Sequence, residues 1–134
     1  MVYMQWLPAL EVGHAKIDDD HRTLVQALND LHTAADQGKD AKEIAKVLNF
    51  LRDYTVTHFS TEETLMIRHK YPKTSEHFTA HADLLMRVSD FIADYRQGRI
   101  ASVAEMMTFL ETWLVEHIQG PDRALGAYLK SVGA

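Results

Sequence analysis

Five histidines and two acids occupy positions that suit a metal centre better than scattered places in a core. They are His21, His58, Glu62, His77, His81, His117 and Asp122. Each falls on the apolar stripe of a predicted helix, where a buried polar side chain needs a partner. Imidazole and carboxylate together suit iron and its neighbours, and the absence of cysteine removes thiolate ligands. The residue types therefore predict a buried metal centre.

Two metal ions account for this donor set better than one. Five imidazoles and two carboxylates are too many donors for a tetrahedral zinc site. We consider two six-coordinate irons, bridged by both carboxylates and by one solvent-derived oxygen. The histidines would then fill five coordination positions, the carboxylates four and the shared oxygen two, which leaves one position vacant. A vacant position beside apolar side chains would suit a small neutral ligand.

Helices must position these donors, and apolar residues recur with helical period in four segments. We expect helices from near Asp18 to Gly38, from Asp40 to Pro72, from Thr74 or Ser75 to Gly98, and from Ser102 through His117. Asp40 with Glu43 and Ser102 with Glu105 resemble capping boxes. The short loops force neighbouring helices antiparallel. The predicted fold is all-α, a single domain over residues 1–134, with an up-down-up-down four-helix bundle, an ordered N-terminal arm over 1–14 and a short helix over 122–130.

The topology of this bundle brings the donors to one end. His21 lies at the start of the first helix and His77 and His81 at the start of the third. His58 and His117 lie late in the second and fourth helices, which run the opposite way. Histidines buried for unrelated reasons would not follow this alternation.

Asp122 is the donor that helical spacing alone does not place. It follows His117 by five residues, which at about 100° per residue turns it off the helix face. Gly120 and Pro121 stand between them, and proline clashes with the carbonyl four residues earlier. A kink or bulge here would return Asp122 to the metal centre. The alternative is that the two residues merely end the helix.

Composition narrows the classes of function. The 134 residues carry a formal charge of −5, so no basic surface for nucleic acid or anionic lipid is expected. No segment resembles a signal peptide or a membrane-spanning helix. We therefore expect a cytoplasmic protein with no nucleic-acid or membrane partner.

Several fragments, taken in order and at their spacing, resemble the hemerythrin-like family of the bacterial single-domain type. The fragments are Trp6, Val12–Gly13, Ile17–Asp18 to His21, His58–Phe59, Glu62–Glu63, His77 to His81, Trp113–Leu114, His117–Ile118 and Asp122. The resemblance implies a non-haem di-iron site, bridged by oxide or hydroxide, that binds dioxygen reversibly. It implies one iron on His77, His81 and His117, and a second iron on His21 and His58. Glu62 and Asp122 would bridge them.

The resemblance also implies that dioxygen binds end-on to the iron held by two histidines, within an apolar pocket. The first and fourth helices would supply its wall, from Leu24, Leu28, Trp113, Leu114 and Ile118. Many relatives carry an aromatic residue soon after the last acid, and Tyr128 is the candidate for that place. His14 belongs to the arm, where it would pack or hydrogen-bond near the site. His32 and His69 lie too far along their helices to be ligands, and Glu63 is expected to be an exposed acid.

We expect an oxygen-binding protein for storage, delivery or scavenging, and not an enzyme. Its partner would be dioxygen, with an oxygen-consuming enzyme, which the sequence does not identify, as a further partner. One alternative is a module that senses oxygen or redox state through a partner, although this chain contains no output domain. A second alternative is a di-iron oxidase or peroxide-handling enzyme. Ferritin-like oxidases use four carboxylates and two Glu-x-x-His motifs, which the present donor set lacks.

Overall fold

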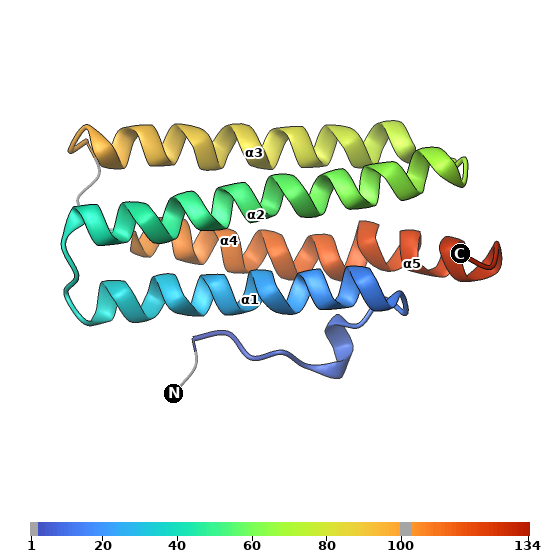
Figure 1. Cartoon of the computed structure of the whole chain (residues 1–134), viewed down its shortest axis with the longest axis horizontal. Coiled ribbons are helices and arrows are strands. Elements are labelled where there is room, and N and C mark those ends of the chain that lie inside the picture. The colour runs from blue at the N-terminus through green and yellow to red at the C-terminus, as the bar shows by residue number, and fades with distance from the viewer. Residues whose placement is uncertain (1–2, 100–102) are drawn as a thin grey trace.

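The computed structural model describes residues 3–99 and 103–134, and the described residues form helices and loops without a strand. The four long helices are α1 (Ala15–Asp36), α2 (Ala41–Arg68), α3 (Thr74–Arg96) and α4 (Ala104–His117). A π-helical turn, η2 (Ile118–Asp122), joins α4 to the short helix α5 (Arg123–Ser131). Figure 1 shows the long helices side by side, with α5 continuing the line of α4. The predicted up-down-up-down bundle is confirmed.

Some of the predicted helix starts agree with the structure and others differ from it. Asp40 caps α2, because its side chain accepts a hydrogen bond from the backbone N–H of Glu43 at 2.9 Å. The first helix begins at Ala15, earlier than predicted, because Nδ1 of His14 accepts from the N–H of Ile17 at 3.4 Å and caps the helix there. His14 therefore acts as a capping residue. The predicted cap at Ser102 lies outside the described residues.

The N-terminal arm is ordered over the described residues that follow position 2, as predicted, and contains the short helix η1 (Pro8–Leu10). Its Met4 is tied to α1 by two hydrogen bonds with Asn29, from Met4 N to Oδ1 at 2.7 Å and from Nδ2 to Met4 O at 2.8 Å. The arm also passes very close to α5. A Cβ atom at Gly126 would overlap the carbonyl oxygen of Val12, so this contact requires glycine.

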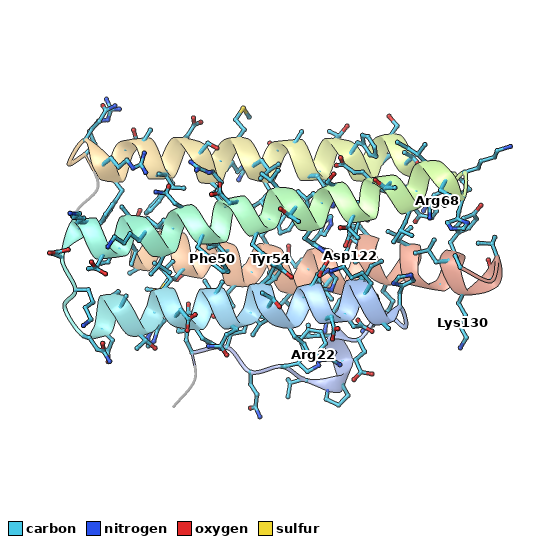
Figure 2. The ribbon with its side chains drawn as sticks, viewed as in Figure 1. Arg22, Phe50, Tyr54, Arg68, Asp122 and Lys130 are labelled. Atoms are coloured by element: carbon cyan, nitrogen blue, oxygen red, sulfur yellow. The ribbon has the colours of Figure 1, made fainter. Side chains whose placement is uncertain are left out.

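The core runs along the bundle axis and is built from the apolar stripes of the helices, as helical periodicity predicts. Within the described residues, no helix combines the length and the apolar character needed to cross a membrane. Figure 2 places Asp122 among the helices, in the half of the bundle whose end carries Arg68 and Lys130. Asp122 is 1% exposed, so this half of the interior contains a buried carboxylate.

Candidate metal centre

All seven predicted donors are buried and meet in this half of the bundle. They form two overlapping groups, in which one ligand atom per residue lies within 4.8 Å of the others. We call them the three-histidine cluster (His77, His81 and His117) and the two-histidine cluster (His21 and His58), and both include Glu62 and Asp122. Helices α1 and α3 contribute histidines near their N-terminal ends, and α2 and α4 contribute residues from their later parts. The alternation expected from topology therefore brings the donors together.

Glu62 extends between the two clusters. Its Oε1 lies 3.2 Å from Nε2 of His77 and 3.2 Å from Nε2 of His81, on the three-histidine side. Its Oε2 lies 2.7 Å from Nε2 of His58 and 3.4 Å from Nε2 of His21, on the two-histidine side. One carboxylate oxygen thus faces each cluster.

Asp122 repeats this arrangement from the opposite side of the bundle. Its Oδ1 lies 2.9 Å from Nε2 of His77 and 3.1 Å from Nε2 of His117, whereas Oδ2 lies 3.0 Å from Nε2 of His21. Two carboxylates that each offer one oxygen to two histidine groups have the geometry of bridging ligands.

The donor atoms fit metal ions better than they fit one another. Several have no hydrogen-bond partner despite their burial. These atoms are Nδ1 and Nε2 of His21, Nε2 of His58, His81 and His117, Oε2 of Glu62 and Oδ1 of Asp122. An unsatisfied buried polar atom is costly, at about 1–3 kcal/mol. A pair of cations bound among these nitrogens and oxygens would remove that cost, and the donor types suit iron.

The protonation states of the metal-free cluster follow from the same contacts. Burial alone would lower the pKa of His21 and His77, but the carboxylates of Asp122 and Glu62 outweigh burial and raise the pKa of each histidine to about 9. Burial would raise the pKa of Glu62 and Asp122, but the histidine rings close to both carboxylates outweigh burial and hold both pKa values well below their usual range. Protons thus balance the buried carboxylates, and a bound metal must displace them.

The π-helical turn η2 accounts for the position of Asp122. A π turn contains more residues than an α turn, so a spacing of five residues brings His117 and Asp122 to the same side. Pro121 lies inside this turn and offers no N–H to the helical ladder. The bulge predicted at Gly120–Pro121 is therefore present. The alternative, that these residues only end the helix, is wrong, because α5 follows directly.

An apolar cavity of about 30 Å³ adjoins the donors. That volume is about twice what one water molecule needs, so a diatomic molecule fits. The cavity is lined by His21, Leu24, Leu28, Leu51, Thr55, His58, Phe59, Leu84, Val88, Leu110, Trp113, Leu114, His117 and Asp122. Both histidines of the two-histidine cluster line it, whereas His117 is the one histidine of the three-histidine cluster that does so.

Four of the five predicted pocket residues line this cavity, namely Leu24, Leu28, Trp113 and Leu114. Ile118 is fully buried but does not line it, because it follows the lining residue His117 and is rotated by about 100° from that face. Sequence reasoning missed the wall from α2 and α3, including Phe59 and Val88. Nothing in the periodicity of one helix shows which neighbour closes a central cavity.

The remaining histidines lie outside both clusters. The ring of His32 stacks on Tyr3 with centroids 4.6 Å apart. The carbonyl of His69 accepts a hydrogen bond from the hydroxyl of Tyr128 at 2.6 Å. The ring of Tyr128 packs on Tyr71 with centroids 5.1 Å apart, so this aromatic residue does not line the cavity.

Two acids that were not predicted as part of the site contact its histidines. Oδ2 of Asp20 lies 2.9 Å from Nδ1 of His58, and Oε2 of Glu63 lies 3.0 Å from Nδ1 of His81. The expectation that Glu63 is simply exposed is wrong, because its side chain is only 30% exposed and reaches this histidine. Metal-binding histidines usually donate their second N–H to a carboxylate. The sequence therefore contained one signal for these two acids, namely that each is adjacent to a predicted ligand: Asp20 precedes His21, and Glu63 follows Glu62.

Comparison with known proteins agrees with this geometry. Residues 12–129 match the family model of the hemerythrin HHE cation binding domain. The chain is 33% identical to a bacteriohemerythrin of Stenotrophomonas maltophilia over 131 residues, which are 98% of this chain and 84% of that protein. It is 35% identical to a bacteriohemerythrin of Pseudomonas aeruginosa over 122 residues, 91% of this chain and 78% of that one. A crystal structure of wild-type hemerythrin superposes with a TM-score of 0.89 at 32% identity, covering 95% of this chain and 98% of that one. This chain belongs to the hemerythrin family.

Proposed function

We propose that this chain binds dioxygen reversibly at a di-iron centre and acts as an oxygen carrier or store, not as an enzyme. The observation that carries the proposal is the position of the cavity. It is apolar, it is large enough for a diatomic molecule, and both histidines of the two-histidine cluster line it. The ligand would therefore reach the metal that has fewer histidines.

The ligand assignment follows from the two clusters. His77, His81 and His117 would hold one iron and His21 and His58 the other, with Glu62 and Asp122 bridging them. The division of each carboxylate between clusters supports the bridging role, since the oxygens of Glu62 lie 2.7 Å from His58 on one side and 3.2 Å from His81 on the other. When bound, an iron pair would supply the two electrons that dioxygen takes up on binding and would take them back when dioxygen leaves.

The protein walls favour release of the ligand over its protonation and irreversible reduction. Thr55 is a polar lining residue outside the clusters, and its hydroxyl donates to the carbonyl of Leu51 at 2.6 Å. Among the described lining residues, the ionisable groups are all members of the two clusters. Leu24 and Trp113 keep the remaining wall apolar. These walls therefore offer no dedicated donor that would deliver a proton to a bound ligand.

The cavity volume argues against an oxidase for bulky substrates. Pockets that hold drug-sized molecules have volumes of about 300–1,000 Å³, whereas this cavity has about 30 Å³. An organic substrate would have to displace core side chains from all four long helices.

The test is anaerobic reconstitution with ferrous iron, followed by alternating admission and removal of dioxygen. We expect two irons per chain and a visible absorption band that appears and disappears over repeated cycles. A single irreversible change, or catalytic consumption of dioxygen with an added organic substrate or peroxide, would contradict the carrier function. Metal analysis in parallel would detect a protein that binds only one ion.

A further inference from the structure

The histidines of the two clusters differ in how their outer nitrogens are held. In His58, Nε2 faces Glu62 at 2.7 Å, and Nδ1 lies 2.9 Å from Oδ2 of Asp20. A carboxylate in this position accepts the Nδ1 hydrogen, which leaves the lone pair of Nε2 directed at the metal centre. Asp20 therefore selects both the tautomer and the orientation of this ring.

Asp20 is itself fixed by two further donors. Its Oδ1 accepts from Nζ of Lys16 at 2.8 Å and from the hydroxyl of Tyr54 at 3.1 Å. The Asp20 side chain is 3% exposed, whereas Lys16 is 61% exposed, so the lysine neutralises a buried charge from the surface. With His58 and Tyr54 on α2 and Lys16 on α1, the carboxylate is held by both helices.

The corresponding contact in the three-histidine cluster is looser. Oε2 of Glu63 lies 3.0 Å from Nδ1 of His81, and the Glu63 side chain makes no other hydrogen bond or ion pair among the described residues. The ring of His81 also has a second support, because Phe59 stacks on it with centroids 3.6 Å apart and planes 4° apart. Loss of Glu63 thus leaves His81 partly oriented, whereas loss of Asp20 removes the contact that fixes the His58 tautomer.

From these contacts, and resting on the proposed di-iron function, we propose that Asp20 and Glu63 are positioning residues that act on different metals. Asp20 acts through His58 on the metal of the two-histidine cluster, where the cavity opens. Glu63 acts through His81 on the metal of the three-histidine cluster. Removing such an outer carboxylate typically lowers metal affinity about 10- to 100-fold. The two acids thus set the affinities of the two metals separately.

The experiment is a titration of metal-free protein with Co²⁺ under anaerobic conditions, followed by absorption and calorimetry. We expect wild-type protein to bind two ions. Asp20→Ala should bind one ion with unchanged affinity and the second about 10- to 100-fold more weakly. Glu63→Ala should weaken the other ion, and by less. Asp19→Ala is the matched control, because Asp19 neighbours Asp20 but pairs with Arg22 at the surface.

A graded series separates positioning from a general structural effect. Asp20→Asn keeps an acceptor for Nδ1 and should recover much of the second binding step. Tyr54→Phe removes one hydrogen bond of Asp20 and should weaken the same ion to a smaller extent. NMR of the cobalt-loaded protein reports the Nδ1 hydrogens of coordinated histidines, and we expect that of His58 to exchange faster with water in Asp20→Ala.

The possible outcomes distinguish the two proposals. Unchanged affinities for both ions in Asp20→Ala, or equal weakening of both, would overturn the positioning role. An unaltered exchange rate of the His58 hydrogen would also overturn it. Wild-type protein that binds fewer than two ions would instead refute the di-iron function and with it this inference.

Discussion

Removal of iron should make the stability of this protein depend strongly on pH. In the metal-free cluster the carboxylates of Asp122 and Glu62 raise the pKa of His21 and His77 from 6.5 to about 9. A raised folded-state pKa contributes stability that is fully present below pH 6.5 and is lost as pH rises through about 9. The depressed pKa values of Glu62 and Asp122 act oppositely, with stability lost as pH falls below their ordinary values of 4.5 and 3.8. Metal-free protein should thus be most stable between these limits.

The size of the alkaline loss follows from the two histidines. The pKa of His21 and of His77 rises from 6.5 in the unfolded chain to about 9 in the folded protein. This rise contributes roughly 3 kcal/mol of stability for each histidine, because one pKa unit corresponds to about 1.36 kcal/mol. Their protons share the same two carboxylates, so the combined loss has an upper limit of roughly 6 kcal/mol. Domains of this kind have unfolding free energies of about 5–15 kcal/mol. Much of the stability of the metal-free protein therefore depends on these protons.

Urea denaturation followed by circular dichroism, at intervals from pH 5 to 10, measures this loss. We expect the free energy of unfolding of metal-free protein to fall by several kcal/mol between pH 6.5 and 9. Iron-loaded protein should change little over that range, because metal ions have already displaced the histidine protons. His32→Ala is a control, since His32 lies outside both clusters. A flat or rising stability of metal-free protein over this interval would refute the electrostatic reasoning.

Three further predictions follow from other parts of the structure. Leu114→Glu places an acid in the apolar cavity wall and should accelerate irreversible oxidation of the diferrous protein, measured as loss of the reversible absorption band. Leu114→Ile is the apolar control. An unchanged oxidation rate in Leu114→Glu would reject the role of the apolar wall. Gly126→Ala should lower the free energy of unfolding by about 1–3 kcal/mol, because its Cβ would overlap the backbone of Val12. The variant should still bind two metals. Stability equal to that of the wild type in urea denaturation would contradict the close packing of the arm on α5. Pro121→Ala restores an N–H inside the π turn and should favour an α-helical register that turns Asp122 away from the donors. Both metals should then bind more weakly in the cobalt titration. Unchanged metal affinity would show that proline is not what maintains the turn.

The amino-acid sequence was sufficient to predict the bundle and the donors because both are encoded locally. Helical periodicity places His58 and Glu62 on one face regardless of the rest of the chain. The direction of successive helices then determines that the donors share one end. Even the irregular turn before Asp122 had a local signal, since proline cannot continue the hydrogen-bond ladder.

Contacts between helices were decided only by the tertiary structure. In the sequence Asp20 is one of three consecutive acids near the start of the first helix, and nothing there distinguishes it from its neighbours. Its role is visible only in the structure, where Oδ2 lies 2.9 Å from Nδ1 of His58 on α2. The cavity likewise depends on how four helices are rotated about their axes, which exposes His21 and His58 to it and turns Ile118 away. A sequence determines the face on which a side chain lies. The partner that this side chain meets across the bundle depends on the packing of all four helices together.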